Sequence, residues 1–252
     1  MSTNFSLKGK VAIVTGCEVG LGYGMAKGLA EAGADIYGAS FPGDFAEIKA
    51  AVEACGRRFE GQKANLMSVE PIDEIVSDCV AKFGHVDILV NNAGIIRRED
   101  SINFSEKDWD DVMNINLKTV FFLSQRVAKE YMKQGGGKII NIASMLSYQG
   151  GIRVPSYCAS KSGVKGITME LANEWAKFNI NVNAIAPGYM ATNNTAPIRA
   201  DAEREASILA RIPAGRWGTP DDVAGVAVFL AAPASDYVNG FTVACDGGWL
   251  AR

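Results

Sequence analysis

The chain has 252 residues, of which 48% are hydrophobic and 21% charged, as in one globular domain with a large buried core. Its net charge of −3 offers no basic surface to nucleic acid or to an anionic membrane, and no apolar run reaches the roughly 18 residues that span a bilayer. The first ten residues contain no apolar signal-peptide core, so we expect a cytoplasmic protein.

Residues that bind metals are scarce in the chain. It has one histidine, His85, and five scattered cysteines without C-x-x-C spacing: Cys17, Cys55, Cys79, Cys158 and Cys245. Zinc sites need clustered cysteine and histidine ligands, so no metal site is predicted. His85 precedes a predicted strand, and we expect it to have a structural role.

Strand-like and helix-like segments alternate from one end of the chain to the other. The predicted strands lie near 10–15, 34–40, 58–64, 86–91, 138–143, 180–186 and 240–245. The predicted helices lie near 20–32, 43–56, 70–83, 107–133, 156–178, 200–210 and 220–232. This alternation predicts an α/β fold, a Rossmann-type, doubly wound sheet of seven parallel strands. No linker or repeat divides the chain, so residues 1–252 form a single predicted domain.

A glycine-rich turn follows the first predicted strand. The apolar run Val11–Val14 precedes it, and apolar residues recur at helical spacing after it until Gly33. Strand, glycine turn and helix form the context of a dinucleotide-binding motif, in which bare backbone lets a pyrophosphate approach a helix N-terminus. The spacing is G-x-x-x-G-x-G rather than G-x-G-x-x-G. The predicted coenzyme contacts here are Gly16, Glu18, Val19, Gly20, Leu21 and Gly22.

The end of the second predicted strand bears on the choice between NAD and NADP. An acidic residue there usually binds the adenosine ribose, whereas this strand ends at Ser40, followed by Phe41. No lysine or arginine replaces the acid, and the glycine turn contains Glu18. A 2′-phosphate near Glu18 would lack a counter-ion, so the sequence favours NAD over NADP, with Ser40 among the coenzyme contacts.

The predicted helix 107–133 is apolar around much of its circumference. A helix of this kind is normally buried, either by its own sheet or by a partner subunit. The pattern alone leaves both interpretations open.

Ser144, Tyr157 and Lys161 indicate dehydrogenase chemistry. A Tyr and a Lys four residues apart share one helix face. The reference pKa of tyrosine is about 10, and an ammonium and an oxidised nicotinamide ring would both favour the phenolate. Lowering that pKa to about 7 needs roughly 4 kcal/mol of differential stabilisation. The Ser144 hydroxyl would hold the substrate oxygen beside Tyr157.

With these residues in place, the chain resembles the short-chain dehydrogenase/reductase family along nearly its whole length. The matching segments are Gly9–Ala12, Asn91–Gly94, Asn116, Ser144, Tyr157, Lys161, Pro187–Gly188 with Thr192, and Asp246–Gly248. The resemblance implies that Tyr157 transfers the proton and that Lys161 lowers its pKa and holds the ribose. It also implies that a helix kink at Asn116 positions a water beside Lys161. The alternative for Asn116 is a helix-interior residue bonded to its own backbone.

The resemblance also implies further contacts and an assembly. The additional coenzyme-binding residues would be Asn65, Leu66, Asn92, Ala93, Gly94, Pro187, Gly188, Met190 and Thr192, together with Tyr157 and Lys161. The helix 107–133 and the Tyr157 helix would pair across a subunit interface, which predicts a homotetramer.

Within the family, the chain is most similar to 2-deoxy-D-gluconate 3-dehydrogenases, also described as 2-dehydro-3-deoxy-D-gluconate 5-dehydrogenases. Segments 96–100, 149–157, 188–195 and 246–252 carry this similarity, which implies a sugar-acid substrate. Arginine fits a planar carboxylate, and Arg153 is the first candidate partner, before Arg97 and Arg98. The predicted substrate contacts are Ser144, Met145, Gln149, Arg153, Tyr157, Tyr189, Asn193 and Asn194, with a mobile lid near 189–213.

Two other functions remain open from the sequence. The same catalytic residues serve reductases of 3-oxoacyl thioesters or simple sugars, because one fold hosts many substrates. A protein that binds NAD without catalysis is the second alternative, although such a protein has no need of a proton donor.

Overall fold

The computed structural model describes residues 4–252 and contains one seven-stranded sheet. Its strands run in the order β3-β2-β1-β4-β5-β6-β7, and every neighbouring pair is parallel, as predicted. The strands are β1 Val11–Thr15, β2 Asp35–Ser40, β3 Phe59–Lys63, β4 Ile88–Asn91, β5 Gly137–Ile142, β6 Ile180–Pro187 and β7 Thr242–Cys245. Central strands such as β1 and β6 are buried throughout, which explains their continuous apolar runs.

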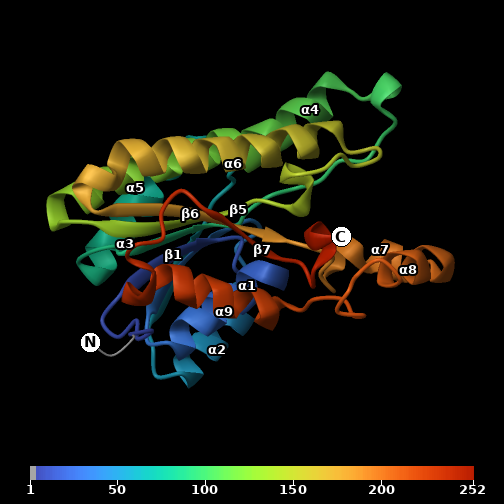
Figure 1. The fold of residues 1–252 in the computed structure, drawn as a ribbon. Coiled ribbons are helices and arrows are strands. Elements are labelled where there is room, and N and C mark those ends of the chain that lie inside the picture. Colours follow the sequence, from blue (N-terminus) through green and yellow to red (C-terminus); the bar gives the residue numbers. More distant parts are fainter. Residues whose placement is uncertain (1–3) are drawn as a thin grey trace.

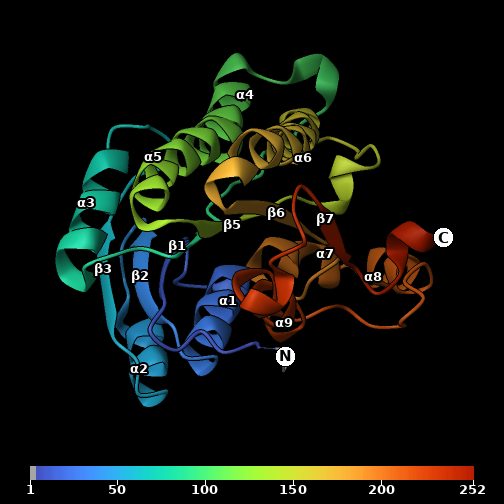
Figure 2. The ribbon, with the colours of Figure 1, turned by 60° about the vertical axis from the view of Figure 1, so that its left-hand side comes forward.

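Helices cover both faces of the sheet (Figures 1 and 2). On one face lie α3 Ile72–Phe83, α5 Thr119–Gln134 and α6 Pro155–Trp175. On the other lie α1 Gly20–Glu31, α2 Ala46–Ala54 and α9 Pro220–Ala231. Each layer encloses its own apolar cluster, so the sheet has a core on both sides. None of the helices within residues 4–252 is long and apolar enough to cross a membrane.

The predicted single helix 107–133 is wrong in one respect. The structure divides it into α4 Glu106–Met113, a π-helical turn Asn114–Lys118, and α5. The π turn contains the fully buried Asn116, whose side chain bonds to a neighbouring loop instead of its own helix. An apolar pattern cannot reveal this break, because the extra residue of a π turn shifts the helical phase by only one position.

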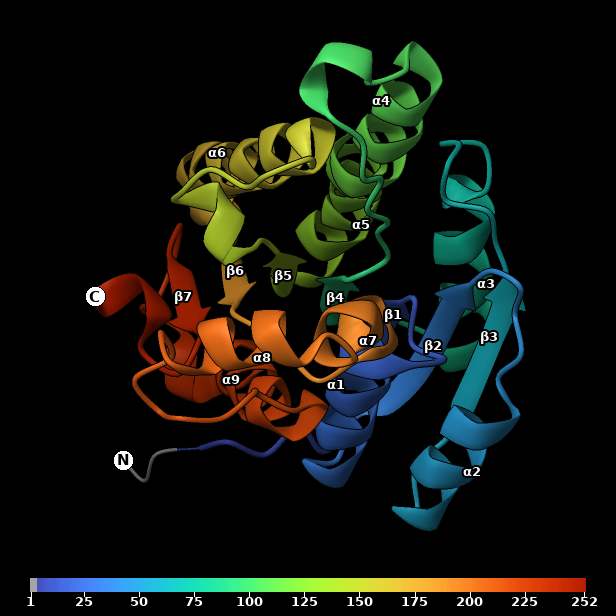
Figure 3. The ribbon, with the colours of Figure 1, turned by 90° about the vertical axis from the view of Figure 1, so that its right-hand side faces the viewer.

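The segment predicted as a lid contains two helices instead of one. They are α7 Ala196–Arg199 and α8 Ala202–Leu209, and a short helix over Asn193–Thr195 precedes them. Figures 1 and 3 show α7 and α8 projecting from the sheet beside the C-terminal segment. The sequence pattern missed α7 because four residues are too few for a helical period to show.

The strand order places the predicted site at one edge of the sheet. The chain reverses its direction of progress between β1 and β4, and in such sheets ligands bind outside the carboxyl ends of the strands at this switch point. Gly16 follows β1, Asn92 follows β4, Ser144 follows β5 and Gly188 follows β6. The predicted site residues therefore converge from four different strands.

Candidate active site

The glycine turn between β1 and α1 has the geometry of an anion-binding loop. Gly16 has φ +64°, and a Cβ atom at Gly22 would overlap the Gly16 carbonyl oxygen, so the chain passes very close to itself here. Val19 is the N-cap of α1 and makes no side-chain capping bond. The first backbone N–H groups of α1 have no partner within the helix and suit a diphosphate. The residues present thus fit a dinucleotide.

The end of β4 is fastened to this loop. The Thr15 hydroxyl accepts hydrogen bonds from the Asn92 and Ala93 backbone N–H groups, at 3.0 and 2.9 Å. The Asn92 amide donates to the carbonyl oxygens of Thr15 and Gly16, at 2.9 and 3.0 Å. The structure therefore brings Asn92 and Ala93 beside the glycine turn, where the sequence predicted coenzyme contacts.

The adenosine end of the predicted site contains opposing charges. The Ser40 hydroxyl accepts a hydrogen bond from Cys17 N, at 3.1 Å, which joins β2 to the glycine turn. Within residues 4–252, Oε1 of Glu18 is buried without a hydrogen-bond partner. The Lys63 ammonium lies 5.0 Å from the centre of the Phe41 ring. The sequence pattern did not reveal this cation, because Lys63 belongs to the neighbouring strand and comes beside Ser40 only in the folded sheet.

Two further predicted adenosine contacts are held by their own surroundings. The Asn65 side-chain oxygen accepts a hydrogen bond from Met67 N at 3.1 Å. The Leu66 carbonyl oxygen accepts one from the Thr119 hydroxyl at 2.9 Å. The first bond lies within the loop after β3, and the second anchors that loop to α5.

Tyr157 and Ser144 come from α6 and from the end of β5. Ser144 precedes a short helical turn, and its hydroxyl accepts a hydrogen bond from Leu146 N at 3.1 Å. Burial raises the pKa of the Tyr157 phenol, while the Ser144 hydroxyl and the Arg98 guanidinium act in the opposite direction. Tyr157 is therefore a protonated phenol at neutral pH.

Lys161 lies 5% exposed, one helical turn after Tyr157. Its ammonium donates to the Ile142 carbonyl oxygen at 2.6 Å and lies 5.6 Å from the centre of the Tyr157 ring. Burial lowers the pKa of Lys161 to about 8. Burial is the largest cause of the raised pKa of Tyr157, and the Lys161 ammonium is directed to a backbone carbonyl. That Lys161 lowers the pKa of Tyr157 when the coenzyme is bound stays a prediction.

Asn116 connects three parts of the site. Its side-chain oxygen accepts a hydrogen bond from Ile95 N at 2.9 Å, and its amide donates to the Ile95 carbonyl oxygen at 3.0 Å. The amide also reaches the Ser160 hydroxyl at 3.2 Å, and Ser160 donates to the Tyr157 carbonyl oxygen at 2.9 Å. The side chain does not bond to its own helix, so that alternative is wrong, and Asn116 positions the Tyr157 helix against the loop after β4.

The three candidate arginines differ in their ion pairs. Arg153 is paired with Asp100 at 3.0 Å and with Glu99 at 3.5 Å. Arg97 is likewise paired, with Asp108 at 3.3 Å and Asp111 at 4.0 Å. Arg98 has no ion pair among residues 4–252, and its charge acts on the Tyr157 phenol. The sequence ranked Arg98 below Arg153 and level with Arg97, whereas the structure leaves Arg98 without an ion pair among the described residues.

The remaining predicted substrate contacts lie around the lid. Tyr189 packs between Trp217 and Trp249, with ring centres 5.4 and 4.8 Å apart. Met145 is buried against α8 and the C-terminal segment. Asn193 and Asn194 are exposed. The sequence analysis missed both tryptophans because aromatic residues in loops carry no periodic signal.

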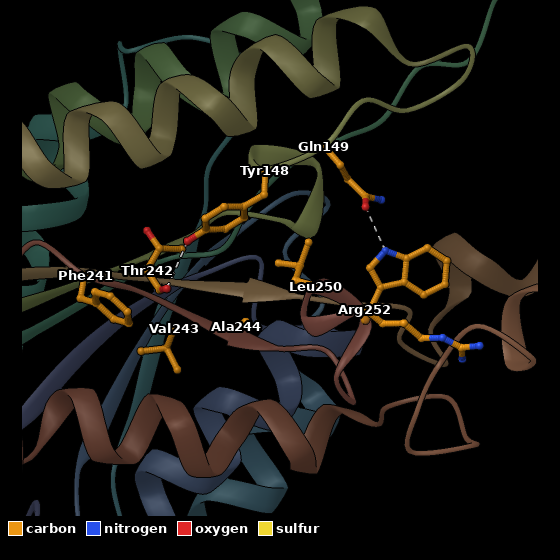
Figure 4. Close-up of a pocket in the computed structure, with 9 residues that line it drawn as sticks. Tyr148, Gln149, Phe241, Thr242, Val243, Ala244, Leu250 and Arg252 are labelled. Carbon is orange, nitrogen blue, oxygen red and sulfur yellow. Dashed lines mark hydrogen bonds between the residues drawn. The ribbon is translucent and has the colours of Figure 1, made fainter.

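Gln149 is directed to the C-terminal segment. Its side-chain oxygen accepts a hydrogen bond from the Trp249 indole at 3.1 Å (Figure 4). A cavity of about 650 Å³ lies beside it, lined by Tyr148, by Phe241 and the first three residues of β7, and by C-terminal residues including Arg252. No catalytic residue lines this cavity. In the described part of the chain, no cluster of three or more acidic, cysteine or histidine side chains is placed to hold a metal ion.

Comparisons with known proteins agree with this geometry. Residues 16–250 match the family model described as enoyl-(acyl carrier protein) reductase. The 2-dehydro-3-deoxy-D-gluconate 5-dehydrogenase of Escherichia coli (strain K12) is 66% identical over 249 residues, which is 98% of each chain. The chain belongs to the short-chain dehydrogenase/reductase family. It is a nicotinamide-dependent oxidoreductase that acts on CH–OH groups, and the predicted family and fold are confirmed.

Solved structures of other members superpose closely on this dehydrogenase. An Agrobacterium tumefaciens protein with bound NADP has a TM-score of 0.91 and 52% identity, with 100% of both chains covered. A gluconate 5-dehydrogenase from Burkholderia cenocepacia, in complex with NADP and tartrate, has a TM-score of 0.94 and 36% identity, covering 99% of this chain and 98% of its own. A nicotinamide coenzyme is therefore established for the fold and site, without a choice between NAD and NADP.

Proposed function

We propose that this dehydrogenase interconverts the secondary alcohol and the ketone of a deoxy sugar acid, such as 2-dehydro-3-deoxy-D-gluconate or 2-deoxy-D-gluconate. The observation that carries the proposal is the Arg98 guanidinium, which lies in the loop after β4 and, unlike Arg97 and Arg153, has no ion pair among residues 4–252. A sugar acid has a carboxylate for this arginine and an oxidisable alcohol for the tyrosine. The 66% identical relative from Escherichia coli, named for such a substrate, supports the same choice.

Each catalytic residue has a defined task in this reaction. When bound, the nicotinamide coenzyme supplies the hydride chemistry. In reduction, the raised pKa of Tyr157 keeps its phenol protonated until it donates the proton to the carbonyl oxygen. The Ser144 hydroxyl holds that oxygen, and Asn116 fixes the Tyr157 helix. In oxidation, Tyr157 must first lose its own proton, and it then accepts the alcohol proton as the phenolate. Lys161 holds a buried positive charge below pH 8, which suits the ribose hydroxyls and the developing phenolate.

NAD(H) is the proposed coenzyme. A 2′-phosphate carries close to two negative charges, and the carboxylate of Glu18 at the glycine turn would repel it. Two observations favour NADP instead: the positive charge of Lys63, and the NADP bound in the two superposed structures. We weigh Glu18 more heavily because it belongs to the glycine turn itself, whereas the Lys63 ammonium lies on the exposed Phe41 ring.

A substrate screen tests the proposal. NADH or NADPH consumption at 340 nm is followed with 2-dehydro-3-deoxy-D-gluconate, 5-ketogluconate, a 3-oxoacyl thioester and a simple ketose, and coenzyme reduction is followed with 2-deoxy-D-gluconate. The expected result is turnover confined to the sugar acids, and faster with NADH. Turnover confined to the thioester or the neutral sugar would refute the substrate. Coenzyme binding without turnover of any of them would favour a binding protein.

We also propose a homotetramer. Phe122 of α5 is 39% exposed and Met169 of α6 is 45% exposed, although both helices also face the sheet. Apolar side chains on these two helices support the subunit pairing that the family resemblance implies. Light scattering after size exclusion tests it, since the expected mass is four times 26.8 kDa. A single 26.8 kDa species would refute the assembly.

A further inference from the structure

Arg199, at the end of α7, is a positively charged side chain held inside the lid. One terminal nitrogen, Nη2, donates to the Thr192 carbonyl oxygen at 3.1 Å. Nε is buried and has no hydrogen-bond partner among residues 4–252. No carboxylate in that part of the chain pairs with this guanidinium, and Nη1 has no partner there either. The guanidinium is partly exposed, and its one buried donor, Nε, is unpaired, although buried donors are costly when left without a partner.

Thr192 places this guanidinium next to the glycine turn. A Cβ atom built on Gly20 would lie 3.7 Å from the Thr192 methyl group, which is van der Waals contact. Gly20 is the first residue of α1, so Thr192 contacts the N-terminal end of that helix. Thr195 fastens the same stretch, because its hydroxyl donates to the Met190 carbonyl oxygen at 2.6 Å and accepts from Thr192 N at 3.2 Å. These hydrogen bonds hold the backbone between Thr192 and Arg199 in one conformation.

The glycine turn itself supplies no cation. Residues 16–22 contain no lysine or arginine, and their one charged residue is the acid Glu18. A dinucleotide diphosphate carries negative charge, and backbone N–H groups at the start of α1 neutralise it only partly. Guanidinium groups bind phosphate oxygens with two parallel hydrogen bonds.

We propose that Arg199 binds the diphosphate of the nicotinamide coenzyme, so that the lid closes on the coenzyme through this residue. The proposal rests on the nicotinamide coenzyme of the family and is independent of the proposed sugar-acid substrate. The other lid arginines differ: Arg204 is exposed, and Arg211 lies 3.9 Å from the centre of the Trp249 ring.

Binding of coenzyme fragments tests this role without catalysis. Titration calorimetry with ADP-ribose, and competition by adenosine against NADH fluorescence, are compared for the wild type, Arg199→Met, Arg199→Lys and Arg204→Met. Arg204→Met is the matched control, because it removes the same charge from the exposed side of the same lid. We expect Arg199→Met to weaken ADP-ribose binding at least roughly tenfold, as expected for a lost charge-assisted bond, and to leave adenosine binding unchanged. Arg199→Lys should restore part of the loss.

Three results would overturn the proposal. Unchanged ADP-ribose affinity in Arg199→Met would refute the contact between Arg199 and the diphosphate. If that variant also had a higher KM for the sugar acid, Arg199 would belong to the substrate site instead. An equal loss for adenosine and ADP-ribose would show a damaged lid. An equal loss in Arg204→Met would show a general charge effect. Since these titrations need no substrate, they are unaffected if the proposed substrate is wrong.

Discussion

Replacing Arg98 tests the assignment of the substrate carboxylate. Arg98 has no ion pair within residues 4–252, whereas its neighbour Arg97 is held by two aspartates and Arg153 by Glu99 and Asp100. A hydrogen bond to a charged group contributes about 1.5–3 kcal/mol, or roughly 10- to 150-fold in kcat/KM. Because Arg98 is exposed, solvent screening places the expected loss near the lower limit, at roughly tenfold.

The assay compares kcat/KM for a sugar acid and for a neutral ketose in Arg98→Met, Arg97→Met and Arg153→Met. Arg97→Met is the matched control, since it removes the same charge from the adjacent position. We expect the loss in Arg98→Met to appear as a higher KM for the acid alone, with less than about threefold change in the two controls. Arg98 also lowers the pKa of Tyr157, so its removal should move the Tyr157-dependent limb of the pH profile to higher pH. A loss confined to Arg153→Met would refute the reasoning.

Two further predictions concern charges in the coenzyme site. Glu18→Gln should strengthen NADP binding roughly tenfold, as expected when one repelling charge is removed near a protein surface. Lys63→Met should weaken NADP binding and leave the affinity for NAD nearly unchanged. Glu53→Gln, an exposed change at the far end of α2, is the control, and equal NADP affinities in all variants would contradict the assignment. The Lys161 ammonium should titrate near pH 8 in the ligand-free protein, because burial disfavours its charged form and so lowers its pKa. Its side-chain NMR signal, assigned with Lys161→Arg, measures this, and a midpoint near the ordinary value of 10.5 would show that the ammonium is not desolvated.

The sequence was sufficient to predict the sheet and the convergence of the catalytic residues. Buried parallel strands are short continuous apolar runs, and residues that follow such strands meet at one edge of the sheet. Gly16 and Ser144 follow β1 and β5 at that edge, as the strand pattern indicated, while their roles in the site stay predictions. Hydrophobic periodicity failed at Asn116 because the π turn is stabilised by side-chain bonds to Ile95, a residue that precedes it by 21 positions.

The arginines show which part of a site cannot be read from the sequence. Arg97, Arg98 and Arg153 have the same chemistry, and only tertiary structure decides which of them acquires an acidic partner. Likewise, the pKa of Tyr157 depends on burial that no motif encodes. The NAD preference and the homotetramer stay predictions for the same reason, as does the cytoplasmic location.

The most direct test of the account is Tyr157→Phe, measured for both turnover and coenzyme binding. General acid–base catalysis contributes about 10²–10⁴-fold, so sugar-acid turnover should fall by at least roughly 100-fold. NADH affinity, measured by fluorescence titration, should stay within about twofold, because the phenyl ring keeps its place in α6. Undiminished turnover in this variant would contradict the account, because Tyr157 is the residue to which the account assigns proton transfer to and from the substrate.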